Sequence, residues 1–164
     1  MNPPKLTIEL VPKTSWFNNV RTIVSTEDWD RIRKSVYARA GHRCEICGGK
    51  GPKHPVECHE VWIYDDETHR QTLARMIALC PSCHECKHAG LANIRGRGDL
   101  IPIHLAMVNE WSIRRAERYV DEQFEIWEQR SRFEWTLDVE CLREYDIDPG
   151  KLERQVKKAA RTSR

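Results

Sequence analysis

The sequence predicts a small α+β protein in which a β-hairpin and a short helix are held at both ends and flanked by further helices. Two C-x-x-C pairs bracket the central segment, short β-rich stretches lie between them, and helical periodicity marks both flanks. The length of 164 residues suits one domain, because domains commonly span roughly 100–200 residues. We expect four segments within it: an N-terminal strand and helix (1–40), the central module (41–95), a C-terminal helical extension (96–148) and a basic tail (149–164).

The composition, 40% hydrophobic and 32% charged, is that of a globular chain and not of a disordered one. No apolar run reaches the roughly 18 residues of a membrane span, and the N-terminus lacks the basic and apolar regions of a secretory signal. We therefore expect a cytoplasmic protein with no membrane partner. In a reducing compartment the seven cysteines would stay thiols, and their pairing favours metal binding over disulfides.

The N-terminal flank is expected to hold one short strand and one helix. Residues Leu6 to Val11 suit a strand, and a loop follows them. Ser25 or Thr26 can cap a helix whose apolar residues recur at helical spacing until Gly41 stops it.

The central segment is expected to fold as a hairpin followed by a helix. The strands run at Val56 to Ile63 and at about His69 to Ala74. A short helix then covers Ser82 to Ala89, with Gly90 as its stop signal.

The C-terminal flank carries a second helical pattern. Beyond Pro102 the apolar residues form one face of a helix of about twenty residues that ends near Arg132. Much of the opposite face is acidic and would repel phosphate, so the helix suits a scaffold or a homodimer contact better than DNA reading. The stretch Trp135 to Val139 suits a short strand or a last small helix.

Positive charge is concentrated at the C-terminus. The formal net charge is +2, but the last fourteen residues carry six Lys or Arg against one Glu, so this tail accounts for +5 and the remainder for about −3. Such a tail is either a solvated segment or an arm that contacts the phosphates of DNA, with Lys157 and Lys158 as the central pair.

The two C-x-x-C pairs predict one structural zinc ion. Its ligands would be Cys44, Cys47, Cys80 and Cys83. Each pair places two thiolates on a tight turn, and two such turns complete a tetrahedral shell. Four thiolates leave no open coordination position, and the binding free energy of such sites, on the order of 10 kcal/mol, makes the surrounding fold depend on the metal.

A second group of candidate ligands lies between the cysteines. His59 stands on the first expected strand with Glu57 and Glu60 close by. His84 and His88 are spaced i, i+4 on the short helix, which puts both imidazoles on one helical face. A hairpin folded onto this helix would bring His59 near the other two, giving a second site distinct from the thiolates.

Three stretches of the central segment, GHRCEICGG, VECHEVW and LCPSCHECKH, together resemble the zinc-knuckle variety of the HNH, or ββα-metal, endonuclease family. In that family cysteine pairs flank a hairpin and a helix, and L-C-x-x-C-H-x-x-x-H is typical of the second half. The resemblance covers about Gly41 to Gly90. It implies a small ββα-metal module and a metal-dependent endonuclease that hydrolyses the phosphodiester bonds of DNA.

The resemblance also implies roles for the histidines. His59 corresponds to the general base that activates water, because a neutral imidazole can take a proton near physiological pH. His84 and His88 correspond to ligands of a divalent ion, such as magnesium or manganese, that holds the scissile phosphate.

Two positions differ from the family pattern. The residue before the base, usually an Asp or His that also binds the metal, is Cys58, which leaves Glu57 and Glu60 as substitute ligands. The middle Asn, which helps to orient the base, is replaced by Arg75, which could contact phosphate but cannot accept a hydrogen bond from an imidazole. The alternative is therefore a non-catalytic zinc module that binds nucleic acid or protein on the same scaffold.

Overall fold

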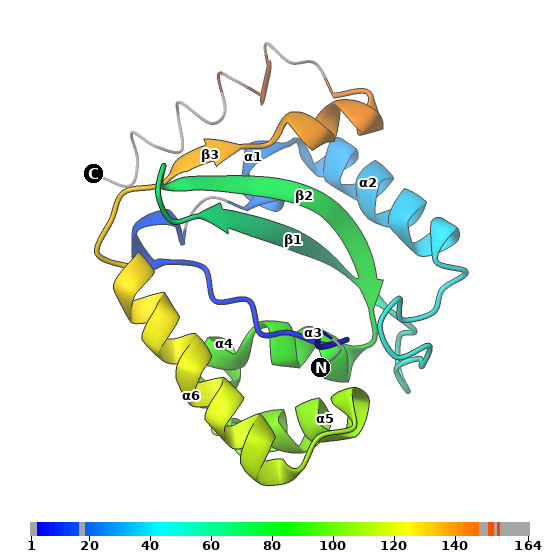
Figure 1. Ribbon diagram of the computed structural model, residues 1–164. Coiled ribbons are helices and arrows are strands. Elements are labelled where there is room, and N and C mark those ends of the chain that lie inside the picture. The colour runs from blue at the N-terminus through cyan, green and yellow to red at the C-terminus, as the bar shows by residue number, and fades with distance from the viewer. Residues whose placement is uncertain (1–2, 17–18, 148–150, 153, 155–164) are drawn as a thin grey trace.

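A three-stranded sheet forms the centre of the α+β fold (Figure 1). The computed structural model describes residues 3–16, 19–147, 151, 152 and 154. Strands β1 (Glu57–Asp65) and β2 (Arg70–Leu79) pair antiparallel as a hairpin, and the short β3 (Thr136–Asp138) pairs parallel with β2. The expected hairpin is therefore confirmed, with a second strand that continues five residues beyond Ala74 to Leu79.

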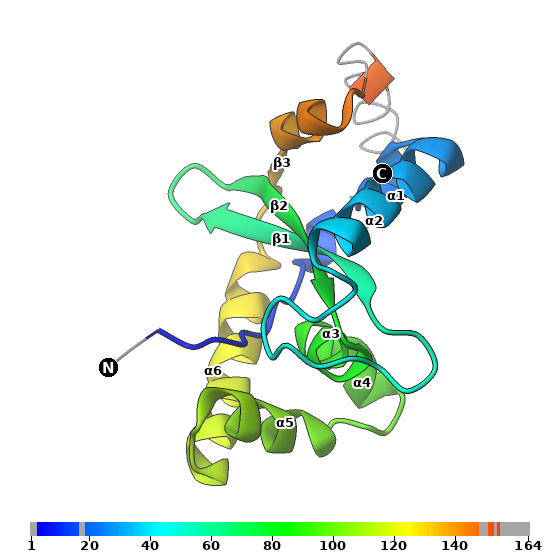
Figure 2. The same ribbon diagram turned by 90° about the vertical axis from the view of Figure 1, so that its right-hand side faces the viewer.

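Helices cover both faces of the hairpin, as Figures 1 and 2 show. On one side lie α1 (Val20–Ile23), α2 (Thr26–Arg39) and the 3-10 helix η2 (Glu140–Tyr145). On the other side lie α3 (Pro81–Lys87), α4 (Ala89–Ile94), α5 (Leu100–Asn109) and α6 (Ile113–Arg130), while a 3-10 turn, η1 (Lys13–Ser15), connects the N-terminal segment to α1. None of the helices in the described ranges combines the length and the apolar character needed to cross a bilayer.

The hairpin separates two hydrophobic clusters, because successive side chains of a strand point to opposite faces. Ile77 and Leu79 of β2 face the cluster beneath α3, α5 and α6. Met76 and Ala78 face the other cluster, which α2 and η2 complete. Each hydrophobic cluster combines residues that are far apart in the sequence, so residues from different expected segments pack together in the same cluster.

The register of the hairpin decides which side chains share a face with the helix α3. His59 pairs with Ile77 and Val61 pairs with Arg75, while a bulge at Ala74 shifts the pairing of the residues beyond. His59 and Glu57 therefore face the α3 side of the sheet. Glu60 points to the opposite side, toward α1 and α2.

The N-terminal segment is extended but belongs to no strand, so the expected strand from Leu6 to Val11 is wrong. Side chains satisfy its backbone: the Asn109 amide bonds both the N–H and the carbonyl of Leu6, at 2.9 Å each, and the Tyr119 hydroxyl accepts from the Ile8 N–H at 3.4 Å. Leu6 and Ile8 are buried in the cluster with α5 and α6. Its apolar side chains alternate because the segment lies between helices, not because it pairs with another strand.

Helix boundaries agree with the sequence at α2 and, within two residues of the expected end near Arg132, at α6, but differ in the central segment. Ser25 caps α2, accepting from the backbone N–H of Asp28 at 3.1 Å. The helix expected over Ser82 to Ala89 is two helices, α3 and α4, and Gly90 lies inside the second of them instead of ending the first.

The C-terminal flank likewise forms two helices, α5 and α6, before β3. The apolar stripe of α6 packs inside the chain, as in a scaffold helix: Tyr119, Val120 and Phe124 lie against the cluster that contains Leu6 and Ile8. The indole N–H of Trp127 donates to the carbonyl of Val11 at 2.9 Å.

Part of the basic tail belongs to the folded body. Leu152 is buried in the cluster with α2, and Lys151 donates to Asp28 at 3.1 Å. Lys157 and Lys158, the expected phosphate contacts, lie outside the described residues.

We predict that Leu6→Ala lowers the free energy of unfolding by about 2–5 kcal/mol, because it empties a fully buried position in the core. Urea unfolding followed by circular dichroism in excess zinc measures this. Ile103→Ala on α5 is the control, since Ile103 is 55% exposed and its loss should cost no more than about 0.5 kcal/mol. Equal costs for the two variants would show that the N-terminal segment is not part of the core.

Candidate metal centres

The first cysteine pair lies on a tight turn that is hydrogen-bonded to the end of β2. Cys44 N–H donates to the carbonyl of Gly49 at 2.9 Å, and the Gly49 N–H points at the Cys47 sulfur at 3.4 Å. Gly48 has a φ of +73°, a conformation that glycine adopts without strain. Glu45 bonds Ala78 through both its backbone N–H and its side chain, so this turn is fixed to the sheet.

The second pair opens α3. Cys80 is the N-cap, Pro81 occupies the first turn, and Cys83 is buried one turn along. The same first turn leads directly to His84, whose backbone N–H donates to the carbonyl of Cys80 at 2.9 Å. The start of α3 therefore positions both the second cysteine pair and His84.

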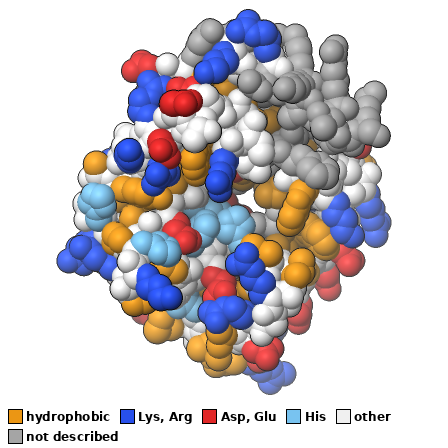
Figure 3. Space-filling view, turned by 180° about the vertical axis from the view of Figure 1, so that it is seen from behind, with side chains coloured by type: hydrophobic (Ala, Val, Ile, Leu, Met, Phe, Trp, Pro, Cys, Tyr) orange, Lys and Arg blue, Asp and Glu red, His pale blue; other side chains and the backbone are white. Residues whose placement is uncertain are grey.

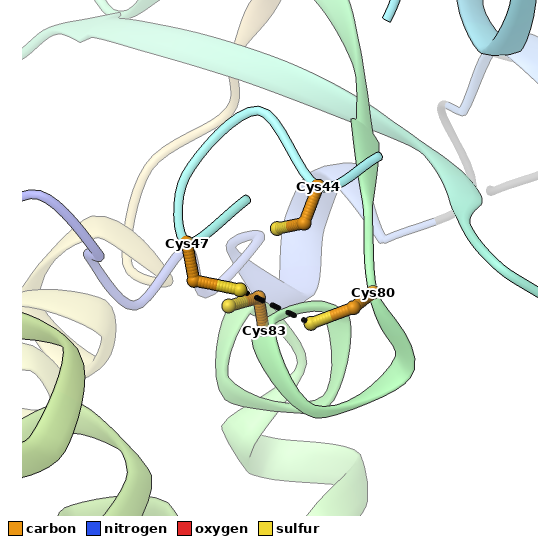
Figure 4. Close-up of side chains that lie close together, drawn as sticks. All are labelled: Cys44, Cys47, Cys80 and Cys83. Atoms are coloured by element: carbon orange, nitrogen blue, oxygen red, sulfur yellow. Dashed lines mark hydrogen bonds between the residues drawn. The ribbon is translucent and has the colours of Figure 1, made fainter. Parts of the chain in front are cut away.

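The four sulfurs converge on one point (Figure 4). They all lie within 4.8 Å of one another, and Cys47 Sγ is 3.6 Å from Cys80 Sγ. The hydrogen bond between Cys44 and Cys83 lowers the pKa of Cys44 and raises that of Cys83, because one proton is shared between them. Sulfurs this close cannot all ionise without a cation among them, so the donor set fits a zinc ion or a similar metal.

His104 of α5 is a neighbour of this four-cysteine cluster that the sequence did not single out as a partner. Its Nε2 lies 3.2 Å from Cys83 Sγ. A ring N–H at this distance can donate to the sulfur and stabilise the thiolate, as groups around metal ligands commonly do.

Three histidines form a second cluster beside the cysteines. The ligand atoms of His59, His84 and His88 lie within 4.8 Å of one another, and the Nε2 atoms of His84 on α3 and of His88, the residue that caps the end of α3, are 3.1 Å apart. His59 comes from β1, and its ring lies 5.4 Å from that of His84 and 5.1 Å from that of His88. Nitrogens bound to one metal at about 2.1 Å are about 3.4 Å apart, so the Nε2 atoms of His84 and His88 are close to the separation that one shared ion requires, with His59 beside them.

The electrostatics of the α3 histidines also suit a metal. Reduced hydration inside the cluster and the neighbouring imidazoles lower the pKa of His84 and of His88, so neither ring is a cation at neutral pH and each has a lone pair to offer. The Nδ1–H of His84 donates to Glu57 Oε2, and the other oxygen of Glu57 pairs with His54 Nε2 at 2.8 Å. Glu57 therefore lies behind His84 and orients its ring, whereas the sequence suggested a direct ligand.

Glu60 is not part of either cluster, which corrects its expected role as a metal ligand. Its carboxylate accepts from the Val20 N–H at 2.7 Å and from the Trp62 indole N–H at 3.1 Å, on the face of the sheet opposite His59. Burial raises the pKa of Glu60 to about 7. Cys58 points to the same far face, where burial raises the pKa of its thiol to about 12. Because successive side chains of β1 point to opposite faces of the sheet, Cys58 and Glu60 both point away from the site.

Arg75 shares the face of His59, two residue pairs further along the hairpin, and is exposed. It forms no hydrogen bond with His59 within the described ranges. The partner of His59 is Glu9 of the N-terminal segment, whose Oε2 lies 3.1 Å from His59 Nε2. Sequence reasoning missed Glu9 because no local pattern links it to a residue fifty positions away.

Histidines gather on one face of the molecule, with carboxylates between them and lysines and arginines around them (Figure 3). No protein-family model matches the chain, and comparisons with curated proteins and with solved structures find no match either. The geometry of the two clusters is therefore the basis for a functional proposal.

We predict that the purified protein retains one zinc per chain at the four-cysteine cluster after gel filtration, as measured by elemental analysis. Cys44→Ser and Cys80→Ser should each lose this zinc and unfold the central module, because three remaining thiolates bind it far more weakly. Cys141→Ser is the control, since Cys141 lies outside both clusters. A folded, zinc-free wild type would disprove a structural metal here.

Proposed function

We propose that this protein is a metal-dependent endonuclease of the HNH, or ββα-metal, type that hydrolyses phosphodiester bonds of DNA. The observation that carries the proposal is the convergence of three imidazoles from β1 and α3 beside a closed four-cysteine cluster. A four-thiolate site has no open position for a substrate, whereas the three-histidine cluster is partly open, with His88 exposed.

The order of the elements supports the same proposal. The hairpin β1–β2 and the helix α3 follow one another, and the cysteine pairs lie before the first strand and at the start of the helix. This is the arrangement that the sequence resemblance implies for an HNH module. The tie between the first cysteine turn and α3 would hold the helix against the hairpin, which brings His59 to His84 and His88.

His84 and His88 are the residues that would hold the ion. A divalent ion there would supply positive charge that stabilises the charge developing on the phosphate during cleavage. Imidazole donors favour Zn²⁺, Ni²⁺ or Fe²⁺, whereas Mg²⁺ prefers oxygen ligands. The donor set thus suits a transition metal better than the magnesium that the resemblance implies.

His59 is the residue that would take the proton from the attacking water. It is buried beneath the α3 histidines, and the nitrogen that does not contact Glu9 is left with the capacity to accept a proton. Arg75, exposed on the same face of the hairpin, would contact phosphate as a cation instead of orienting His59.

We predict that the zinc-loaded protein nicks plasmid DNA when Zn²⁺, Ni²⁺ or Mn²⁺ is added, and that His59→Ala lowers the rate by about 100- to 10,000-fold. Loss of a base should leave binding of the added ion unchanged, as isothermal titration calorimetry would show. His88→Ala should instead weaken ion binding, and its activity should recover partly at higher metal concentration.

The matched control is His42→Asn, since His42 lies outside the cluster at a φ of 54° that asparagine tolerates. It should cut at the wild-type rate. A wild type that cuts neither DNA nor RNA with any of these metals, yet binds a nucleic acid or a protein, would replace the proposal with the non-catalytic zinc module.

We predict that removing residues 155–164 weakens DNA binding and makes its salt dependence less steep, because the segment carries four Lys or Arg and no acid. The slope of log affinity against log salt should fall by about 0.9 for each phosphate that the shortened chain no longer neutralises. Thermal stability should be retained, because Lys151 and Leu152 remain in place. Lys157→Gln with Lys158→Gln should reproduce part of the change, whereas an unchanged slope would show that the tail is only solvated.

A further inference from the structure

The N-terminal segment reaches the three-histidine cluster through a buried ion pair. Lys87 of α3 donates to Glu9 Oε1 at 2.6 Å and to Thr7 Oγ1 at 2.7 Å. The side chains of Lys87 and Glu9 are only 4% and 13% exposed. The Glu9 backbone N–H also donates to the carbonyl of Lys87 at 3.3 Å, so the segment is fixed to the helix at this point.

The second oxygen of Glu9 contacts His59. The Glu9 Oε2 atom lies 3.1 Å from Nε2 of His59, whose side chain is 5% exposed. The ammonium of Lys87, 2.6 Å from Glu9 Oε1, keeps the Glu9 carboxylate in its ionised form. An ionised carboxylate can only accept, so the Nε2 of His59 must carry the hydrogen and the lone pair of the neutral ring is on Nδ1.

Stability alone is a weak reason for this arrangement. Two buried charges lose their hydration, and replacing such a pair with apolar side chains is often neutral or stabilising. Leu6 and Ile8 already fix the segment through apolar burial on either side of Thr7. The buried ion pair is therefore better explained by the contact of Glu9 with His59 than by stability.

We propose that Glu9 is a positioning residue for His59, and that Lys87 holds Glu9 in place for it. Glu9 accepts from Nε2–H and so fixes both the orientation of the ring and the tautomer that leaves Nδ1 free to accept a proton. This inference rests on the proposed function for its effect on cleavage, but the tautomer itself is independent of cleavage. The N-terminal segment thereby becomes part of the site, although it lies outside the hairpin and helix that carry the histidines.

The test combines a spectrum with kinetics. In the zinc-loaded protein with isotope-labelled histidine, proton–nitrogen correlation spectra report the tautomer of each ring, and His59→Ala assigns the signal. The wild type should show His59 as the Nε2–H form. The double variant Glu9→Leu with Lys87→Met, which removes both buried charges together, should lose that preference and lower kcat for plasmid nicking by about 10- to 100-fold with little change in KM.

Two further variants separate positioning from a general loss of structure. Glu9→Gln keeps an oxygen that can accept from Nε2–H, so its kcat should lie between those of the wild type and the double variant. Lys5→Met with Glu110→Gln removes an exposed ion pair of the same segment and should leave both readouts unchanged.

The outcomes are distinct. A wild-type His59 in the Nδ1–H form, or a folded double variant with the wild-type tautomer and kcat, would overturn the role of Glu9 while leaving the proposed nuclease intact. A wild type that cuts no nucleic acid would overturn the nuclease, and the tautomer spectra would then decide the role of Glu9 by themselves.

Discussion

The constraint on which the rest of the structure depends is the convergence of four sulfurs between two turns that are distant in the sequence. The turn at Cys44 is fixed to the end of β2 through Glu45, and the turn at Cys80 begins α3. Holding these turns together fixes the angle at which α3 leaves the hairpin. The three-histidine cluster depends on that angle, because His59 belongs to β1 while His84 lies on α3 and His88 caps its end.

In both clusters, a group behind some of the side chains orients the atom that faces the other members of the cluster. Glu57 accepts from one nitrogen of His84 and leaves the other toward His88, as Glu9 does for His59. His104 stands in a comparable position to Cys83. Two of these partners, Glu9 of the N-terminal segment and His104 of α5, lie outside the central module, so the surrounding fold helps to orient the ligands that the module supplies.

Much of the fold and of the four-cysteine cluster could be predicted from the sequence, because the signals are local. Two C-x-x-C pairs specify tight turns, the alternation between them predicts a hairpin, and an i, i+4 pair puts His84 and His88 on one helical face. The cap at Ser25 identifies the start of α2 in the same way. Each of these depends on residues within about one turn of one another, and backbone geometry fixes their relative positions.

Tertiary packing decided what local patterns leave open. The alternation of Leu6 and Ile8 predicts a strand, but the helices α5 and α6 lie where a partner strand would be, so side chains satisfy the backbone instead. The sequence by itself determined that His59 and Glu60 point to opposite faces once β1 is a strand, yet which face meets α3 depended on the register with β2. Glu9 reaches His59 only through the packing of the N-terminal segment on α3, a contact across fifty residues that no spacing encodes.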